Sequence, residues 1–165
     1  MVDSTPLIPD GKDEEKKQGH KVLCCFDSRK AVLIFSAIAL VFTIAIFTDA
    51  ATSGKADAGR IINFIVNVIV FIAAMVSAFT FGIQGVVAGI VMAIANIIWF
   101  AVYLVRNREW FAQNQGTEEG TAYIVIVAIT YLVSLLVIYA NSVYVYEVRK
   151  GIMSKETHSR EKYSW

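Results

Sequence analysis

Long stretches of apolar residues without a single charge constrain this chain more than any other feature. The first of them, AVLIFSAIALVFTIAIFT, covers residues 31–48. As a helix with a rise of about 1.5 Å per residue it would reach about 27 Å, enough to cross the hydrocarbon core of a bilayer. Similar stretches cover residues 61–83, 85–105 and 121–145. The sequence therefore predicts an all-α, integral membrane four-helix bundle.

The second and third stretches are almost continuous, and a single helix of their joint length would be far too long for a bilayer. We therefore expect a tight hairpin around Gly82, Gln84 and Gly85. Residues 1–30 and 146–165 are polar and form two tails that flank the bundle of residues 31–145. Because four spans return the chain to its starting side, both tails are expected on one side of the membrane.

The distribution of basic residues predicts which side that is. Six of them precede the first span and five follow the last, out of fifteen in the chain. Since basic residues accumulate in the cytosolic segments of membrane proteins, we expect both termini to be cytosolic. Aromatic residues mark the two membrane interfaces in this arrangement. They are Tyr139, Tyr144 and Tyr146 on the cytosolic side, and Trp99, Tyr103, Trp110, Phe111 and Tyr123 on the other.

Small residues indicate where helices approach closely. Lipid is as apolar as leucine, so helices in a membrane associate through close packing and hydrogen bonds. Gly85 and Gly89 form a G-x-x-x-G pattern, and Gly82 and Ala93 extend this small-residue face. We interpret it as packing within the bundle, with a homo-oligomer contact as the alternative.

Asn67, Asn96 and Thr130 fall at a similar depth in three different spans. Asn63 lies four residues before Asn67 and shares its helix face, so it joins the same polar layer. One hypothesis is a small polar site for a substrate or ion within the bundle. The other, which we favour, is that these side chains hydrogen-bond to one another and hold the helices together.

Several function classes lack their usual sequence signals. No Asp, Glu, Lys, Arg or His occurs within the four apolar stretches, although proton relays and ion-coupled carriers generally need such a residue. No nucleophile with a base, carboxylate pair, phosphate-binding loop or metal-ligand cluster is present, so we expect neither an enzyme nor a bound cofactor or metal. A net charge of +1 indicates no nucleic-acid partner.

The N-terminal tail contains the stretch DSTPLI, in which Asp3 stands four residues before the apolar pair Leu7 and Ile8. In a cytosolic tail this pattern resembles the acidic dileucine sorting signal. That resemblance implies recognition by clathrin adaptor complexes, with pockets for the apolar pair and a basic patch for the acid. Pro6 keeps the segment extended, as such a peptide requires.

Cys24 and Cys25 lie a few residues before the first span, beside basic residues. Juxtamembrane cysteines are candidates for reversible palmitoylation, and small apolar interface residues are the alternative interpretation. Two adjacent cysteines do not form a disulfide framework.

Two segments are similar to a known family. CCFDSRKAVLIFSAIAL resembles the start of the lysosomal-associated four-span membrane proteins, where cysteines and an arginine lead into the first helix. VIYANSVYVYEVRKGI is similar to the last span of that family and its basic tail. The family's P-P-x-Y tail motifs are missing, so coupling to ubiquitin ligases is not carried over. The small four-span vesicle proteins of the MARVEL type share the same plan and compete with this assignment.

These observations predict a non-enzymatic, multi-pass protein of the late endosomal, lysosomal or vacuolar membrane, with the plasma membrane or Golgi as the alternative. We expect it to act as a trafficking adaptor or accessory subunit for other membrane proteins. The alternatives are a small passive facilitator that uses the polar layer, and a membrane-shaping protein.

Overall fold

The computed structural model describes residues 21–22, 26–54 and 57–154, and they form an almost entirely helical structure. The long helices are α1 (Ser28–Thr52), α2 (Ala58–Thr80), α3 (Gln84–Arg106) and α5 (Glu118–Arg149), with a short α4 (Arg108–Gln113) between the last two. Four helices are long and apolar enough to cross a membrane, so the predicted all-α bundle is confirmed. The described residues also include one small antiparallel pair, β1 (Lys21–Val22) with β2 (Phe26–Asp27).

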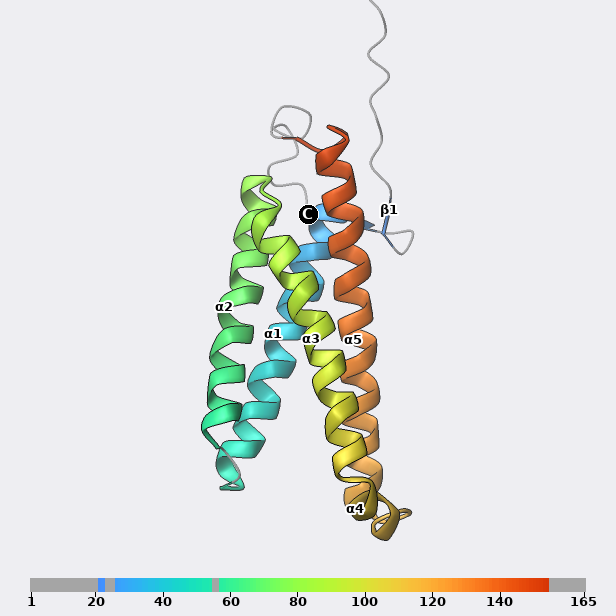
Figure 1. Cartoon of the computed structure of the whole chain (residues 1–165). Helices are drawn as coiled ribbons and strands as arrows, with labels where there is room; N and C mark the ends of the chain where they lie inside the picture. Colours follow the sequence, from blue (N-terminus) through green and yellow to red (C-terminus); the bar gives the residue numbers. More distant parts are fainter. Residues whose placement is uncertain (1–20, 23–25, 55–56, 155–165) are drawn as a thin grey trace, which may run out of the picture.

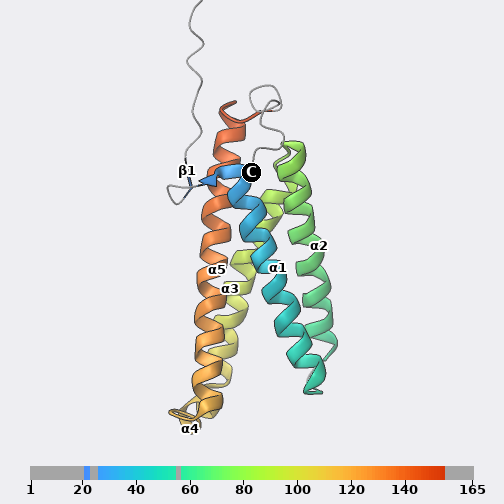
Figure 2. The ribbon, with the colours of Figure 1, turned by 180° about the vertical axis from the view of Figure 1, so that it is seen from behind.

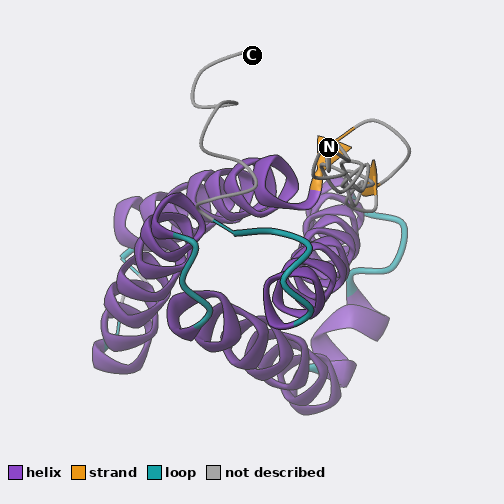
Figure 3. Ribbon diagram, turned by 90° about the horizontal axis from the view of Figure 1, so that it is seen from above, coloured by secondary structure: helices purple, strands orange, loops and turns teal. Residues whose placement is uncertain are grey.

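The four long helices pack in a ring in which α1 contacts α2, α2 contacts α3, α3 contacts α5, and α5 contacts α1. Figure 3 shows this arrangement from above, with the strands beside the bundle. The start of α1, the end of α5 and the α2–α3 hairpin lie at the same end of the bundle, which we call the hairpin end (Figure 1). Both ends of the described chain therefore lie on one side, as the even number of spans predicts.

Each long helix begins earlier than the corresponding apolar stretch, and α1, α3 and α5 also end later. The exception is α2, which ends at Thr80, three residues before the end of its stretch. The side chain of Asp57 accepts a hydrogen bond from the Arg60 backbone N–H at 2.8 Å, and Thr117 accepts one from the Gly120 N–H at 3.1 Å. Each side chain satisfies a backbone donor in the first helical turn, so α2 and α5 begin at these caps. Apolar length alone locates the spans but does not fix their ends.

The hairpin lies close to its expected place, but Gly85 has a different role. α2 ends at Thr80, and Phe81 adopts a left-handed conformation with a φ of 57°. α3 then starts at Gln84, so Gly85 belongs to the helix rather than to the turn. A Cβ atom at Gly85 would overlap with the backbone carbonyl of Ala73 and with Ser77 Oγ. Gly85 thus allows α3 to lie directly against α2.

Most buried residues lie in the half of the bundle near the hairpin end. They occupy residues 28–39 of α1, 67–78 of α2, 86–93 of α3 and 134–147 of α5, together with Met153 beyond α5. Ala50, Gly120 and Val127 are the other buried residues outside these ranges. Figures 1 and 2 show the α1–α2 pair diverging from the α3–α5 pair towards the opposite end. The bundle is therefore tightly packed at one end and open at the other.

Replacing Gly85 with alanine should destabilise the protein by about 1–3 kcal/mol, because the new methyl group forces α3 away from α2. Gly82→Ala is the matched control, since a Cβ there lies 3.5 Å or more from its neighbours. The control should change stability by less than about 0.5 kcal/mol. Thermal unfolding in detergent micelles, followed by far-UV circular dichroism, measures both. Equal effects would contradict the close α2–α3 contact at Gly85.

Candidate functional site

The described part of the chain has two polar clusters that join its helices, and an apolar groove at the end opposite the hairpin. The first cluster consists of three asparagines on α2 and α3. Asn96 Nδ2 donates to Asn67 Oδ1 at 2.8 Å, and Asn67 Nδ2 donates to the Asn63 carbonyl at 2.8 Å and to Asn63 Oδ1 at 3.1 Å. Asn67 is 2% exposed. These three side chains thus form a chain of hydrogen bonds that joins α2 to α3.

Thr130, the fourth member of the expected polar layer, does not join the asparagines. Its hydroxyl donates to the Ile126 carbonyl of its own helix at 2.8 Å. Equal depth places residues at one level but does not make them face one another, because that depends on the rotation of each helix. The polar cluster therefore belongs to two helices rather than three.

The small-residue face follows the α2–α3 and α3–α5 contacts within the bundle. A Cβ at Gly89 would lie 2.8 Å from Asn141 Nδ2 of α5 and 3.4 Å from the Ala74 Cβ of α2. Ala93 is buried in a cluster that includes Phe71 and Val137. Gly89 and Ala93 thus allow two neighbouring helices to approach α3. Gly82 makes only ordinary contacts at the turn.

The second polar cluster, at the hairpin end, centres on a carboxyl group that the apolar stretches did not reveal. Glu147 of α5 is 0% exposed, and its Oε2 accepts a hydrogen bond from the hydroxyl of Ser28, the first residue of α1. Gly151 turns the chain back with a φ of 67°, and the Met153 sulfur then lies 3.8 Å from Ser28 Oγ. This contact holds the start of α1 against the end of α5.

The sequence does indicate that Glu147 is buried. Val137, Ala140, Tyr144 and Glu147 follow a spacing of three, four and three residues, which places them on one helix face. All four are buried. Tyr144 is therefore an interior residue rather than an interface anchor, and its hydroxyl lies 3.4 Å from the Ser77 carbonyl. The apolar stretch ends at residue 145, two residues before Glu147, so the stretch alone does not reveal this buried carboxyl.

Arg29 connects the start of α1 to the end of α2. Its Nε donates to the Ala78 carbonyl at 3.0 Å and its Nη2 donates to the Phe79 carbonyl at 3.2 Å. The guanidinium also lies 4.4 Å from the centre of the Phe81 ring. The last carbonyls of a helix lack partners within it and carry partial negative charge, so a cation is favourable there. Arg29 and Ser28 thus fasten α1 to both of its neighbours.

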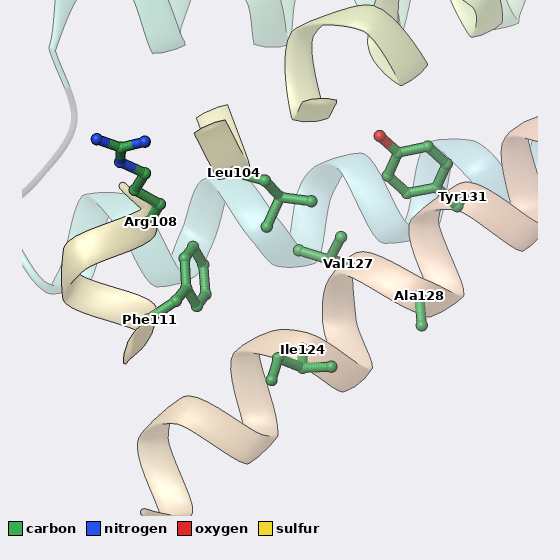
Figure 4. Close-up of a pocket in the computed structure, with 7 residues that line it drawn as sticks. All are labelled: Leu104, Arg108, Phe111, Ile124, Val127, Ala128 and Tyr131. Atoms are coloured by element: carbon green, nitrogen blue, oxygen red, sulfur yellow. The ribbon is translucent and has the colours of Figure 1, made fainter. Parts of the chain in front are cut away.

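The apolar groove lies at the other end of the bundle (Figure 4). It has a volume of about 550 Å³, and α3, α4 and α5 form it. Arg108 lies at one edge of the groove. The lining residues are Leu104, Arg108, Phe111, Ile124, Val127, Ala128 and Tyr131. The Tyr131 hydroxyl is 3.2 Å from the Ile97 carbonyl and donates to it, so the groove offers few polar groups to orient a small polar substrate.

Four of the five aromatics expected at this interface gather beside the groove. The Tyr103 and Tyr123 rings stack with centres 5.7 Å apart, and the Phe111 and Tyr123 rings are 5.3 Å apart. Trp110 packs edge-on against Phe111 at 5.1 Å. This ring cluster joins α4 to the helices on either side of it.

Five residues of the expected sites lie outside the described residues. They are Asp3, Leu7 and Ile8 of the sorting pattern, and Cys24 and Cys25 of the lipidation pattern. Among the described residues, no group of three or more histidine, cysteine or acidic side chains is positioned to hold a metal ion. No protein-family model, curated protein or solved structure matches this chain.

Ser28→Ala should lower the free energy of unfolding by about 1–3 kcal/mol, because the buried Glu147 carboxyl loses a hydrogen-bond donor. Ser36→Ala is the matched control on the same helix, since the buried Ser36 hydroxyl has no hydrogen-bond partner within the described residues. The control should be neutral or slightly stabilising. Chemical denaturation of both purified variants measures the difference, and a loss at Ser36 as large as that at Ser28 would contradict this assignment.

Asn96→Ala should destabilise the bundle by about 0.6–2 kcal/mol, because it breaks the hydrogen bond between α2 and α3. Thr130→Val should change stability by less than about 0.5 kcal/mol, since that hydroxyl contacts only its own helix. The same denaturation assay applies. A double variant with Asn67→Ala should lose little more than Asn96→Ala alone if the two amides act as a pair.

Proposed function

We propose that this multi-pass membrane protein is a non-enzymatic trafficking adaptor or accessory subunit for other membrane proteins of the endolysosomal or vacuolar system. One observation carries the proposal. The asparagines that would line a polar path through the bundle are instead bonded to one another across α2 and α3. Such a bundle is suited to be a stable scaffold in the membrane. In this proposal, its tails bind the sorting machinery and its lipid-facing surface binds other membrane proteins.

The N-terminal tail contains the proposed sorting signal. The four-span topology puts the start of α1 and the end of α5 at one end of the bundle. The abundance of basic residues in both tails favours the cytosol for that end. In this orientation Asp3, Leu7 and Ile8 are accessible to clathrin adaptor complexes, and Cys24 and Cys25 are accessible to palmitoylation. The resemblance to the lysosomal-associated four-span proteins supports the same location.

The lipid-facing surface supplies the proposed contact with other membrane proteins. Large apolar side chains are exposed along every long helix, among them Val41 on α1, Ile69 on α2, Val91 on α3 and Leu135 on α5. A bilayer covers such side chains, and the membrane helices of a partner can replace lipid there at little cost. The open end of the bundle offers the largest share of this surface.

The Leu7→Ala/Ile8→Ala double variant tests the proposed sorting signal. A C-terminally tagged parent chain should accumulate in acidic organelles, and the double variant should move to the cell surface because the adaptor pockets lose both aliphatic side chains. Microscopy together with surface biotinylation measures the shift. An Asp10→Asn variant is the control, because Asp10 is an acidic residue of the same tail outside the pattern. A shared location for the parent and the double variant would refute the sorting assignment.

The accessory role has its own readout. In cells without the chain, the lysosomal abundance of a defined set of membrane proteins should change, and the parent chain should restore it where the Leu7→Ala/Ile8→Ala variant does not.

Solute flux through vesicles that contain only this chain should equal that of empty vesicles. A flux that Asn96→Ala abolishes without unfolding the protein would instead favour a facilitator.

A further inference from the structure

A second groove, at the hairpin end, combines an apolar floor with two cations. It lies between α3 and α5 and has a volume of about 460 Å³. Ile90 of α3 and Val145 of α5 supply apolar lining, while Arg149 and Lys150 lie at the end of α5. The full lining is Ile90, Ser142, Val145, Tyr146, Arg149 and Lys150.

The lining changes character along the helix axis. Ser142, Tyr146 and Arg149 follow one another at intervals of four and three residues, so they share one face of α5. From Ser142 to Arg149 the helix rises about 10 Å. Ile90, Ser142 and Val145 thus lie deeper in the bundle, and the cations lie at its end. A phospholipid has the matching polarity, with acyl chains inside the membrane and a charged phosphate at its surface.

The two cations are available to a ligand. Among residues 21–22, 26–54 and 57–154, neither Arg149 nor Lys150 pairs with a carboxylate, and both side chains are exposed. Lys150 Nζ lies 6.0 Å from the centre of the Tyr146 ring, which is itself half-exposed. Two cations beside a tyrosine at the membrane interface are complementary to an anionic headgroup.

We propose that this groove binds one anionic phospholipid, with its phosphate between Arg149 and Lys150 and an acyl chain against Ile90 and Val145. Basic pockets between membrane helices attract anionic headgroups because the cations neutralise charge next to a low-dielectric region. If the hairpin end is cytosolic, as the basic tails favour, the groove opens to the leaflet that is rich in anionic lipids. The binding chemistry itself does not depend on that orientation.

The probe is a pair of lipids with identical acyl chains, phosphatidylserine and phosphatidylcholine. The full chain is reconstituted with an equal mixture of the two, extracted in mild detergent, and analysed by native mass spectrometry for the lipid that it retains. The parent should retain one phosphatidylserine in preference to phosphatidylcholine. Arg149→Gln/Lys150→Gln should reduce that preference by about tenfold, since each basic residue near an anionic lipid contributes a several-fold preference.

Two controls separate a groove from diffuse attraction. Arg106→Gln/Arg108→Gln removes the same charge at the opposite end of the bundle and should leave the preference intact. Ser142→Trp fills the groove without changing its charge and should abolish retention. Leu135→Trp adds an indole to an exposed position of α5 outside the groove and should not.

Three outcomes would overturn the proposal. One is equal retention of both lipids by the parent. Another is a loss of preference that occurs equally in the control at the opposite end of the bundle. The third is retention that survives Ser142→Trp, which would indicate surface charge without a groove. If inorganic phosphate binds to the detergent-solubilised parent and the anionic lipid does not, the site recognises free phosphate and the lipid assignment is wrong.

Discussion

The fastening of α1 to α2 and α5 at the hairpin end is the interaction on which the rest of the bundle depends. Lipid chains solvate apolar helices as well as other helices do, so association requires close packing and hydrogen bonds. Arg29 supplies bonds to the last carbonyls of α2, and Ser28 supplies one to Glu147 of α5. On the other side of the ring, Gly85 and Gly89 bring α3 into contact with α2 and α5. Every pair of neighbouring helices therefore has either a polar or a close-packed contact near this end.

The spans could be predicted from sequence because an uncharged apolar stretch of bilayer length rarely occurs in a soluble domain of this size. The bounds of the helices could not, because they depend on local caps such as Asp57 and Thr117, which lie outside the apolar stretches. The bonding of Asn67 to Asn96 follows from equal depth on adjacent antiparallel helices. Thr130 has the same depth, but the rotation of α5 about its axis, which sequence depth does not specify, directs its hydroxyl to its own backbone.

Glu147 illustrates a different limit. Polar residues near the end of an apolar stretch are normally read as the start of a solvated tail, and that rule assigned Glu147 to the C-terminal tail. Its regular spacing from Ala140 and Tyr144 contradicts the rule and would have placed it on the buried face. Helix periodicity continues past the end of an apolar stretch, so it is the better criterion where the two disagree.

The uneven burial along the helices has a mechanical consequence. In a bundle that is fastened at one end and loosely packed at the other, separating the helices costs least free energy at the loosely packed end, where the fewest side chains are buried. α5 alone has 32 residues, which corresponds to about 48 Å and exceeds the thickness of a bilayer's hydrocarbon core. In bilayers of different thickness, the splay between the α1–α2 and α3–α5 pairs can adjust while the hairpin end keeps its shape.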